Sequence, residues 1–357
     1  MAYITLNTTK LRSNFDYLEN LFKVNNIQWS VVSKMLCGHK EYLQELLKFD
    51  IKQICDSRIS NLKTVKQINP NVETIYIRPP RKRGIAGVVQ YADISMNTEV
   101  ETIKLLSAEA QKQNKIHKII IMIELGELRE GVMRDDLMDF YHSVFNLANI
   151  EVVGLGANLS CLYGVLPNHD KLIQLSLYEQ LIEAKFDKKI AYVSGGSSVT
   201  IPLILNNLLP NGINHFRVGE TLFLGTDVYS HVRLEQMETA VFKLYSEIIE
   251  LIEKPKIPMG EMGTNVDGNT TDFDETTLGE TSYRAIVDIG LLDVDEKHIS
   301  PSDKDITIVG GSSDMFVIDL YDNKKKYKVG DLIEFKMDYM GVLKILHSKY
   351  IDKKIVQ

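Results

Sequence analysis

The sequence predicts an α/β protein in which an N-terminal (β/α)8 TIM barrel precedes a C-terminal all-β domain. Three observations support this fold class. Eight short β-rich runs alternate with amphipathic helical patterns through the first two-thirds of the chain. Many of these runs are continuously apolar, as expected of parallel strands that are buried on both faces. After about residue 235 the pattern changes to strand-like segments joined by short turns.

The eight β-rich runs are the expected barrel strands. Segments such as EYLQELLKF and DKLIQLSLYEQLIEAKF lie between them and have the apolar spacing of helices that pack on a sheet. Eight strand–helix units in about 200 to 250 residues match a TIM barrel. A doubly wound sheet usually needs fewer strands and a glycine-rich first turn, whereas the first turn here offers only Gly38. The runs cover residues 28–33, 52–57, 73–78, 92–97, 118–125, 151–159, 190–196 and 214–219.

We therefore expect two domains, a barrel over residues 1–235 and a β domain over residues 236–357. Strand-like segments in the second part include TAVFKLYSEIIEL, YRAIVDIGLLDVD and GVLKILHSKYI. The segment 255–282 is long, rich in Gly, Thr and Asp, and carries acidic residues without Lys or Arg between residues 257 and 282. Loops of this length are usually lids, binding loops or disordered segments.

Composition excludes several classes of protein. The chain has 357 residues, of which 44% are hydrophobic and 25% charged, and two domains are the natural expectation. A net charge of −7 argues against nucleic-acid binding. No apolar run could span a bilayer, and the polar first residues do not form a signal peptide, so we expect a cytoplasmic protein without a membrane partner. The three cysteines form no CxxC pair and the histidines no HxxxH pair, so neither a disulfide framework nor a metal site is expected.

Lys34 is the leading candidate for a reactive residue. It ends the first apolar run, in WSVVSKMLCGHKE, and active sites of TIM barrels lie at the carboxyl ends of the strands. An amine there can lose its proton and attack a carbonyl. The other strand ends carry polar residues, which predicts a net-basic pocket suited to an anionic ligand. These residues are Arg58, Arg78, Asn97, Arg129, Asn158, Ser197, Ser198 and Arg217.

Two glycine-containing turns predict a site for a phosphate. SGGSS (194–198) and FRVGE (216–220) follow the last two strands, where TIM barrels frequently bind phosphate. A helix cap with a tight turn is the alternative for SGGSS. Arg217 interrupts an apolar strand and needs a buried partner, for which a ring nitrogen or a carboxylate is a candidate. Cys161 follows a strand end and is either a small buried side chain or part of the pocket.

These residues resemble fold-type III pyridoxal phosphate (PLP) enzymes of the alanine racemase superfamily, and within it the ornithine racemase-like branch. The resemblance covers nearly the whole chain. It rests on the order and spacing of VVSKMLCGH, IELGELREG, GLGANLSCLYGV, SGGSS, FRVGE and GGSSDMFVIDL.

The resemblance implies a role for each matching residue. Lys34 is where the family holds PLP as a Schiff base. Arg129 matches the arginine near the cofactor's phenolic oxygen, and Asn158 stands where alanine racemases have a histidine. At the phosphate the resemblance places Ser198, Gly219 and, by its backbone, Glu220, and at the ring nitrogen Arg217; Ser197 is a further cofactor-binding candidate.

The resemblance also implies a homodimer with active sites at the interface, because the segment containing Asp314 resembles one that reaches a neighbouring subunit's site. Two departures are visible. Met122 stands where alanine racemases have a lysine, often carbamylated, that holds the arginine. Their second base is a tyrosine early in the β domain, yet residues 255–282 contain none, which leaves Tyr283 and Asp314 as candidates, with Cys161 as a pocket residue.

The predicted function is racemisation of a free amino acid with PLP as cofactor. Lys34 acts as a base on one face of Cα, and a second group returns the proton on the other face. Ornithine is the expected substrate, with lysine or alanine as alternatives. The acidic segment could pair with the second amino group of ornithine or lysine, and a solvated loop is the alternative interpretation of this segment. A PLP-binding protein without catalysis and another fold-type III lyase are the competing functions.

Overall fold

The computed structural model describes residues 2–264, 268, 270 and 272–357. The chain forms two compact units. One comprises Thr9–Thr239, and the other comprises Ala240–Gln357 together with the first residues of the chain, up to Thr8.

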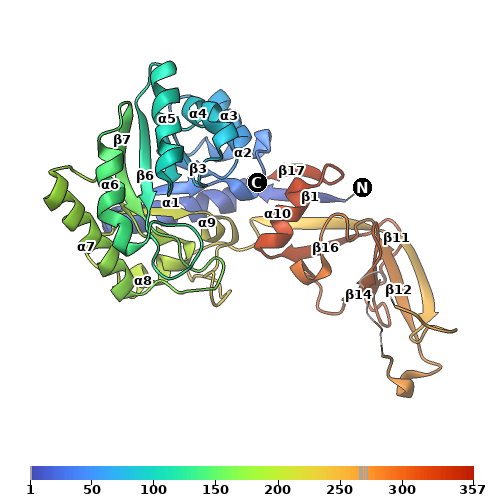
Figure 1. Cartoon of the computed structure of the whole chain (residues 1–357). Coiled ribbons are helices and arrows are strands. Elements are labelled where there is room, and N and C mark those ends of the chain that lie inside the picture. The colour runs from blue at the N-terminus through green and yellow to red at the C-terminus, as the bar shows by residue number, and fades with distance from the viewer. Residues whose placement is uncertain (1, 265–267, 269, 271) are drawn as a thin grey trace. The chain divides into compact units, whose positions relative to one another are not determined.

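The first unit is built on parallel strands in a nearly closed barrel, which confirms the predicted TIM barrel (Figure 1). The strands follow one another in chain order, and β10 pairs with β2 on one side and with β9 on the other. Only Gly195 separates β8 from β9, so these two segments are one interrupted strand and the barrel strands number eight. Their bounds are β2 Gln28–Val32, β3 Gln53–Asp56, β4 Glu73–Tyr76, β5 Ile94–Asn97, β6 His117–Met122, β7 Ile150–Gly156, β8 Tyr192–Ser194, β9 Gly196–Ser197 and β10 His215–Val218.

Helices surround the strands (Figure 1), and α1 shows how such a helix buries one apolar face. In α1 the buried residues Leu11, Phe15, Leu18 and Phe22 recur every three or four positions, as one face of a helix requires. The helices are α1 Thr8–Val24, α2 Lys40–Leu46, α3 Ile59–Ile68, α4 Ile85–Tyr91, α5 Val100–Lys112, α6 Leu137–Phe145, α7 His169–Phe186, α8 Ile201–Leu205 and α9 Glu220–Leu224.

The barrel contains an apolar cluster and a polar cluster. Inward-facing side chains of β2 to β7 form the apolar cluster, which includes Val32, Cys55, Ile75, Ile120 and Met122. The side chains Ser30, Gln53, Ser194 and His215 are also buried, and they are joined by hydrogen bonds. Burying a polar group without a partner costs free energy of folding. The side chains are therefore held in the orientations that keep their hydrogen bonds.

The second unit is an antiparallel β domain, as predicted. Strands β13, β16, β11, β12, β15 and β14 lie side by side in this order. Strand β1 adds to this sheet by pairing with β11 and β17. The bounds are β1 Tyr3–Asn7, β11 Phe242–Pro255, β12 Thr281–Val287, β13 Ile299–Pro301, β14 Thr307–Gly311, β15 Phe316–Asp319, β16 Leu332–Met337 and β17 Asp352–Val356.

One segment of the β domain was predicted wrongly. GVLKILHSKYI was expected as a strand, but most of it belongs to helix α10, Tyr339–His347. The side chain of Asp338 accepts a hydrogen bond from Gly341 N and caps this helix. Val342, Ile345 and Leu346 are buried at helical spacing, which a short apolar run does not distinguish from a strand.

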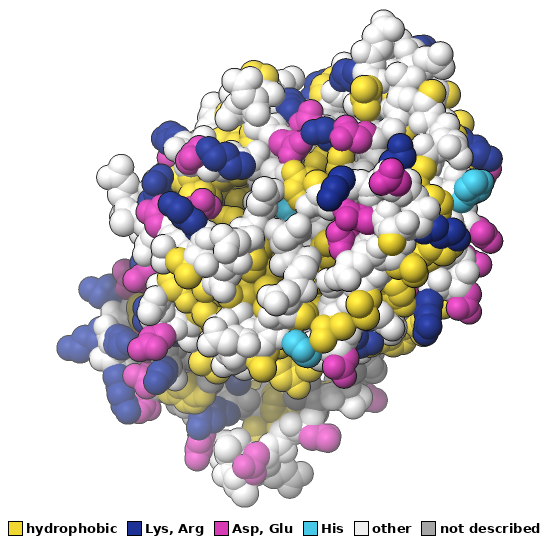
Figure 2. Space-filling model, turned by 90° about the vertical axis from the view of Figure 1, so that its left-hand side faces the viewer, with side chains coloured by type: hydrophobic (Ala, Val, Ile, Leu, Met, Phe, Trp, Pro, Cys, Tyr) yellow, Lys and Arg dark blue, Asp and Glu magenta, His cyan; other side chains and the backbone are white. Residues whose placement is uncertain are grey.

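Charges on the surface are mixed in sign. On the face of the barrel domain that lies at the left of Figure 1, acidic and basic side chains are interspersed (Figure 2). The basic segment after β4 is exposed at Arg78, Arg81, Lys82 and Arg83. In the described part of the chain, no helix combines the length and apolarity that crossing a bilayer would require.

Candidate active site

Lys34 lies two residues after the end of strand β2 and begins a single helical turn, Lys34–Leu36. Its side chain is exposed. The chain then reverses through Cys37 and Gly38, whose φ angles are 51° and 75°. A side chain at position 38 would lie 2.5 Å from the amide oxygen of Asn61, so glycine is required there both by φ and by space. The backbone that carries the lysine is therefore closely confined.

A buried carboxyl group stabilises the residue before this lysine. Ser33 Oγ donates to Asp56 Oδ2 at 2.9 Å, and Asn61 Nδ2 donates to Asp56 Oδ1 at 3.1 Å. Burial raises the pKa of Asp56, while hydrogen bonds from the Arg58 backbone N–H and from Ser33 partly oppose that change. Asp56 is not among the site residues predicted from the sequence, although KQICDS places an acid at the end of an apolar strand.

Arg217 lies inside the barrel on β10 and is only 5% exposed. Its Nη1 donates to the carbonyl and the hydroxyl of Ser194, and its Nη2 donates to Ala157 O and Asn158 Oδ1, both at 2.8 Å. Within the described part of the chain, no group accepts from Nε and no carboxylate accepts from this guanidinium. Both terminal nitrogens are therefore used by the protein, and Nε is the remaining donor.

Glu130, which was not predicted as a site residue, joins three residues that were. Asn158 accepts from Arg217 through Oδ1 and donates through Nδ2 to Glu130 Oε1. Glu130 also pairs with Arg129 in two contacts, of 2.6 and 2.7 Å. The neighbouring charges fix the amide of Asn158, because its oxygen must face the cation and its nitrogen the anion. Arg129, Asn158 and Arg217 thus form one network.

Glu127 ties the loop after β6 to the loop after β7. Its carboxylate accepts backbone N–H groups of Ser160, Cys161, Tyr163 and Val165 at 2.8 to 3.0 Å, and that of Leu162 as well. Burial raises the pKa of this carboxyl group, but the N–H groups outweigh burial and lower the pKa to about 2. This residue holds the backbone beside Asn158.

The two glycine-containing turns lie next to each other. Ser198 Oγ accepts from the backbone N–H groups of Gly219 and Thr221, both at 3.3 Å. Ser197 caps the helical turn Ser198–Thr200. A side chain at position 219 would lie 2.8 Å from Val32 O, so the two strands approach closely there. Since β10 also pairs with β2, these turns are adjacent to the strand that leads to Lys34.

The other predicted site residues lie outside the network around Arg217. Cys161 is exposed, and its thiol contacts Leu159 O at 3.7 Å. In the β domain, Tyr283 lies on β12 and is 37% exposed. Asp314 is exposed in the turn between β14 and β15 and accepts from the hydroxyl groups of Ser312 and Ser313. Glu220 is the first residue of α9.

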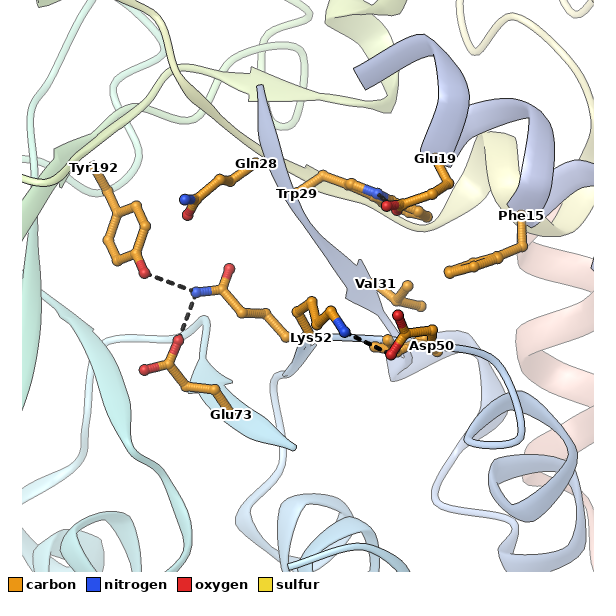
Figure 3. Close-up of a pocket in the computed structure, with 11 residues that line it drawn as sticks. Phe15, Glu19, Gln28, Trp29, Val31, Asp50, Lys52, Glu73 and Tyr192 are labelled. Carbon is orange, nitrogen blue, oxygen red and sulfur yellow. Dashed lines mark hydrogen bonds and ion pairs between the residues drawn. The ribbon is translucent and has the colours of Figure 1, made fainter. Parts of the chain in front are cut away.

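A cavity of about 340 Å³ lies at the opposite ends of the strands, away from these residues (Figure 3). Trp29 and Phe15 line one part of it, and Glu73 and Tyr192 line another. Glu73 and Tyr192 both contact the amide nitrogen of Gln53, at 2.6 and 3.1 Å. Because TIM-barrel active sites lie at the carboxyl ends of the strands, we do not assign the reaction to this cavity.

Comparisons with known proteins agree on one family. A family model described as "Alanine racemase, N-terminal domain" matches residues 6–227. An ornithine racemase from Acetoanaerobium sticklandii is 37% identical over 354 residues, which cover 99% of each chain. A lysine racemase from Thermotoga maritima is 28% identical over 350 residues, which cover 98% of this chain and 97% of the relative.

Solved structures show the same fold. An alanine racemase from Clostridium difficile 630 superimposes with a TM-score of 0.77 at 16% identity, covering 99% of this chain and 95% of that chain. An alanine racemase from Bartonella henselae with covalently bound pyridoxal phosphate superimposes with a TM-score of 0.75 at 18% identity, covering 99% of both chains.

We predict that Glu127→Gln loosens the loop after β7. An amide offers one acceptor oxygen in place of two charged ones, so amide hydrogen exchange over residues 160–165 should accelerate roughly tenfold or more at neutral pH. The carboxyl pKa is lowered in the folded chain, so its stabilising effect exists above its ordinary value of 4.5 and disappears as the pH falls towards about 2. The difference between variant and wild type should shrink over that range. Equal exchange in Glu127→Gln and in Glu101→Gln, an exposed control on α5, would contradict this role.

Proposed function

The chain belongs to the alanine racemase family and is a pyridoxal-phosphate-dependent amino-acid racemase, and on this premise we propose that it interconverts L- and D-ornithine. The observation that supports this substrate most strongly is the full-length similarity to an ornithine racemase, at higher identity than to a lysine racemase. Lysine, which is longer by one methylene group, is the second candidate. We further propose that the enzyme works as a cytoplasmic homodimer.

The residues present fit the cofactor. Ser198 and the backbone N–H groups of Gly219 and Glu220 would hold the phosphate, with Ser197 beside them, because hydroxyl and N–H donors converge on neighbouring turns. A Cβ at Gly196 would overlap the Phe216 ring and one at Gly219 would lie 2.8 Å from Val32 O, so glycine lets the strands that carry these turns pack closely. Lys34 would carry the cofactor, since it follows the strand paired with β10.

Arg217 would face the ring nitrogen through Nε, the donor that the protein leaves unused. An arginine does not give up its proton, so it would act only as a donor and keep the ring nitrogen unprotonated. Arg129 would lie on the side of the phenolic oxygen. Where alanine racemases use a lysine to hold this arginine, Met122 is buried in the apolar cluster, and Glu130 pairs with Arg129 instead.

The bound cofactor supplies electron withdrawal that acidifies the hydrogen on the substrate's Cα. Lys34 would accept that proton on one face. Inversion requires a second group on the opposite face, because one lysine cannot readily reach both. We propose Tyr283 or Asp314 of the β domain for this role, supplied by the second copy in a homodimer, with Cys161 beside the substrate. The resemblance of the Asp314 segment to one that reaches a neighbouring subunit supports this arrangement.

Substrate identity is tested with purified protein, PLP and a panel of free L- and D-amino acids in deuterated water. We expect racemisation of ornithine with deuterium at Cα of both enantiomers. We also expect a kcat/KM about tenfold above that for lysine, because one methylene group discriminates by roughly that factor. Tight PLP binding without exchange on any amino acid would instead identify a binding protein.

The role of Lys34 is tested by replacing it with alanine. Borohydride reduction of the wild-type protein, followed by peptide mapping, should find the cofactor attached to Lys34. Lys34→Ala should lose both this attachment and the visible absorbance of the bound cofactor. Lys40→Ala changes another exposed lysine, the first residue of α2, and should retain both. Covalent attachment that persists in Lys34→Ala would overturn the assignment.

The second base is tested with Tyr283→Phe and Asp314→Asn. Removing a general base should lower kcat for racemisation by about a hundredfold or more. Starting from each pure enantiomer, deuterium exchange should persist only for the one whose Cα hydrogen faces Lys34. Tyr321→Phe is a matched control, since Tyr321 is a half-exposed tyrosine of the same domain. If both variants racemise the substrate with the wild-type kcat, a group other than Tyr283 or Asp314 returns the proton.

A further inference from the structure

A chain of side-chain hydrogen bonds crosses the barrel interior from Arg217 towards the cavity at the other end. Arg217 Nη1 contacts Ser194 Oγ, which lies 2.6 Å from His215 Nδ1. His215 Nε2 lies 3.0 Å from Gln53 Oε1, and Gln53 Nε2 lies 2.6 Å from Glu73 Oε2. Ser194 and His215 are fully buried, so solvent does not compete for these contacts.

The direction of each bond follows from its two ends. A carboxylate can only accept, so the amide nitrogen of Gln53 must face Glu73, and its oxygen must face His215. Ser30 Oγ also donates to this oxygen, at 3.0 Å, and its own lone pair then faces His215 Nε2 at 2.9 Å. The imidazole nitrogen that faces the amide oxygen, Nε2, therefore carries the proton. Nδ1 is left with a lone pair and accepts from the hydroxyl group of Ser194.

At the other end the guanidinium of Arg217 can only donate. Ser194 Oγ must accept from Nη1, and its own proton must point away, towards His215 Nδ1. The constraints from Arg217 and from Glu73 therefore lead to the same arrangement. Every donor in the chain points away from Arg217 and towards Glu73. Lys118 Nζ lies 3.3 Å from the other oxygen of Glu73 and completes the chain.

The imidazole is neutral in this setting. Burial lowers the pKa of His215 to about 3, and the charge of Arg217 acts in the same direction. A doubly protonated ring would remove the acceptor that Ser194 uses and would place a second cation two residues from Arg217. Only one of the two neutral tautomers, the one with the proton on Nε2, satisfies both neighbours.

We propose that His215 is a positioning residue for Arg217: as the neutral Nε2–H tautomer it accepts a hydrogen bond from the Ser194 hydroxyl group, which leaves a serine lone pair facing Nη1. The guanidinium is thereby oriented with Nε free for the cofactor ring. This role rests on the proposed function of the site. His215 would then influence the cofactor through Arg217, without contacting the cofactor itself.

The first test needs neither cofactor nor substrate. Nitrogen-15 NMR of the imidazole rings in the protein without PLP should show His215 as the Nε2–H tautomer between pH 5 and 8, about the range over which an ordinary histidine titrates. The Nδ1–H tautomer, or a charged ring at pH 7, would overturn the proposal. If the wild-type protein showed this tautomer but racemised no amino acid, the proposed function would fail while the arrangement around Arg217 stood.

The second test compares His215→Leu with His117→Leu. His117 is a matched control, because it is 2% exposed, burial lowers its pKa to about 4, and its ring contacts Ser95 Oγ at 2.8 Å. His215→Leu should weaken PLP binding by about tenfold or more and shift the absorbance spectrum of the bound cofactor, since a buried hydroxyl loses its acceptor. His117→Leu should change neither. Equal effects of the two substitutions would show a merely structural role.

Two further variants keep the proposal testable if His215→Leu does not fold. His215→Asn retains an acceptor near the position of Nδ1 and should restore part of the PLP affinity and of the spectrum. Ser194→Ala removes the lone pair offered to Arg217 and should shift the spectrum in the same direction as His215→Leu. A wild-type spectrum and affinity in Ser194→Ala would contradict the proposal.

Discussion

The polar architecture of this protein depends on one buried charge, that of Arg217. The guanidinium lies inside the barrel and receives no direct carboxylate contact from the described residues, so its charge must be compensated through hydrogen-bonded neighbours. Asn158 connects it to Glu130, and Ser194 connects it through His215 and Gln53 to Glu73. A guanidinium that is fixed by four hydrogen bonds keeps one orientation. A cofactor site requires such a preorganised donor.

The closure of the barrel brings the other site residues to this charge. The seventh strand is interrupted at Gly195 and still pairs with β10, which in turn pairs with β2. The strand end that precedes Lys34 and the turns that contain Ser198 and Gly219 are therefore neighbours. Loops after β6 and β7 are held together by Glu127 and Glu130. Both carboxylates belong to the loop after β6. Glu127 accepts backbone N–H groups of the loop after β7, and Glu130 accepts from the Asn158 side chain and pairs with Arg129.

The sequence predicted the barrel well because parallel strands buried on both faces must be apolar throughout, and that pattern is local. It predicted the β domain with one error at helix α10, where a short apolar run fits either structure. Lys34, Arg129, Asn158 and Arg217 were found through motifs at strand ends. Glu127, Glu130, Asp56 and His215 were missed, because each of them contacts groups on other strands or loops that are distant from it in the sequence.

The sequence by itself determined the order of the strands, the residue types at their ends and the family to which the chain belongs. Only the tertiary structure decided which of those residues share a network, and through which partners. The physical reason is that periodicity records which side chains are buried along one element. The partner of a buried charge comes from another strand, and only the closed barrel brings Arg217, Asn158 and Glu130 together, or aligns Ser194 and His215 in one chain.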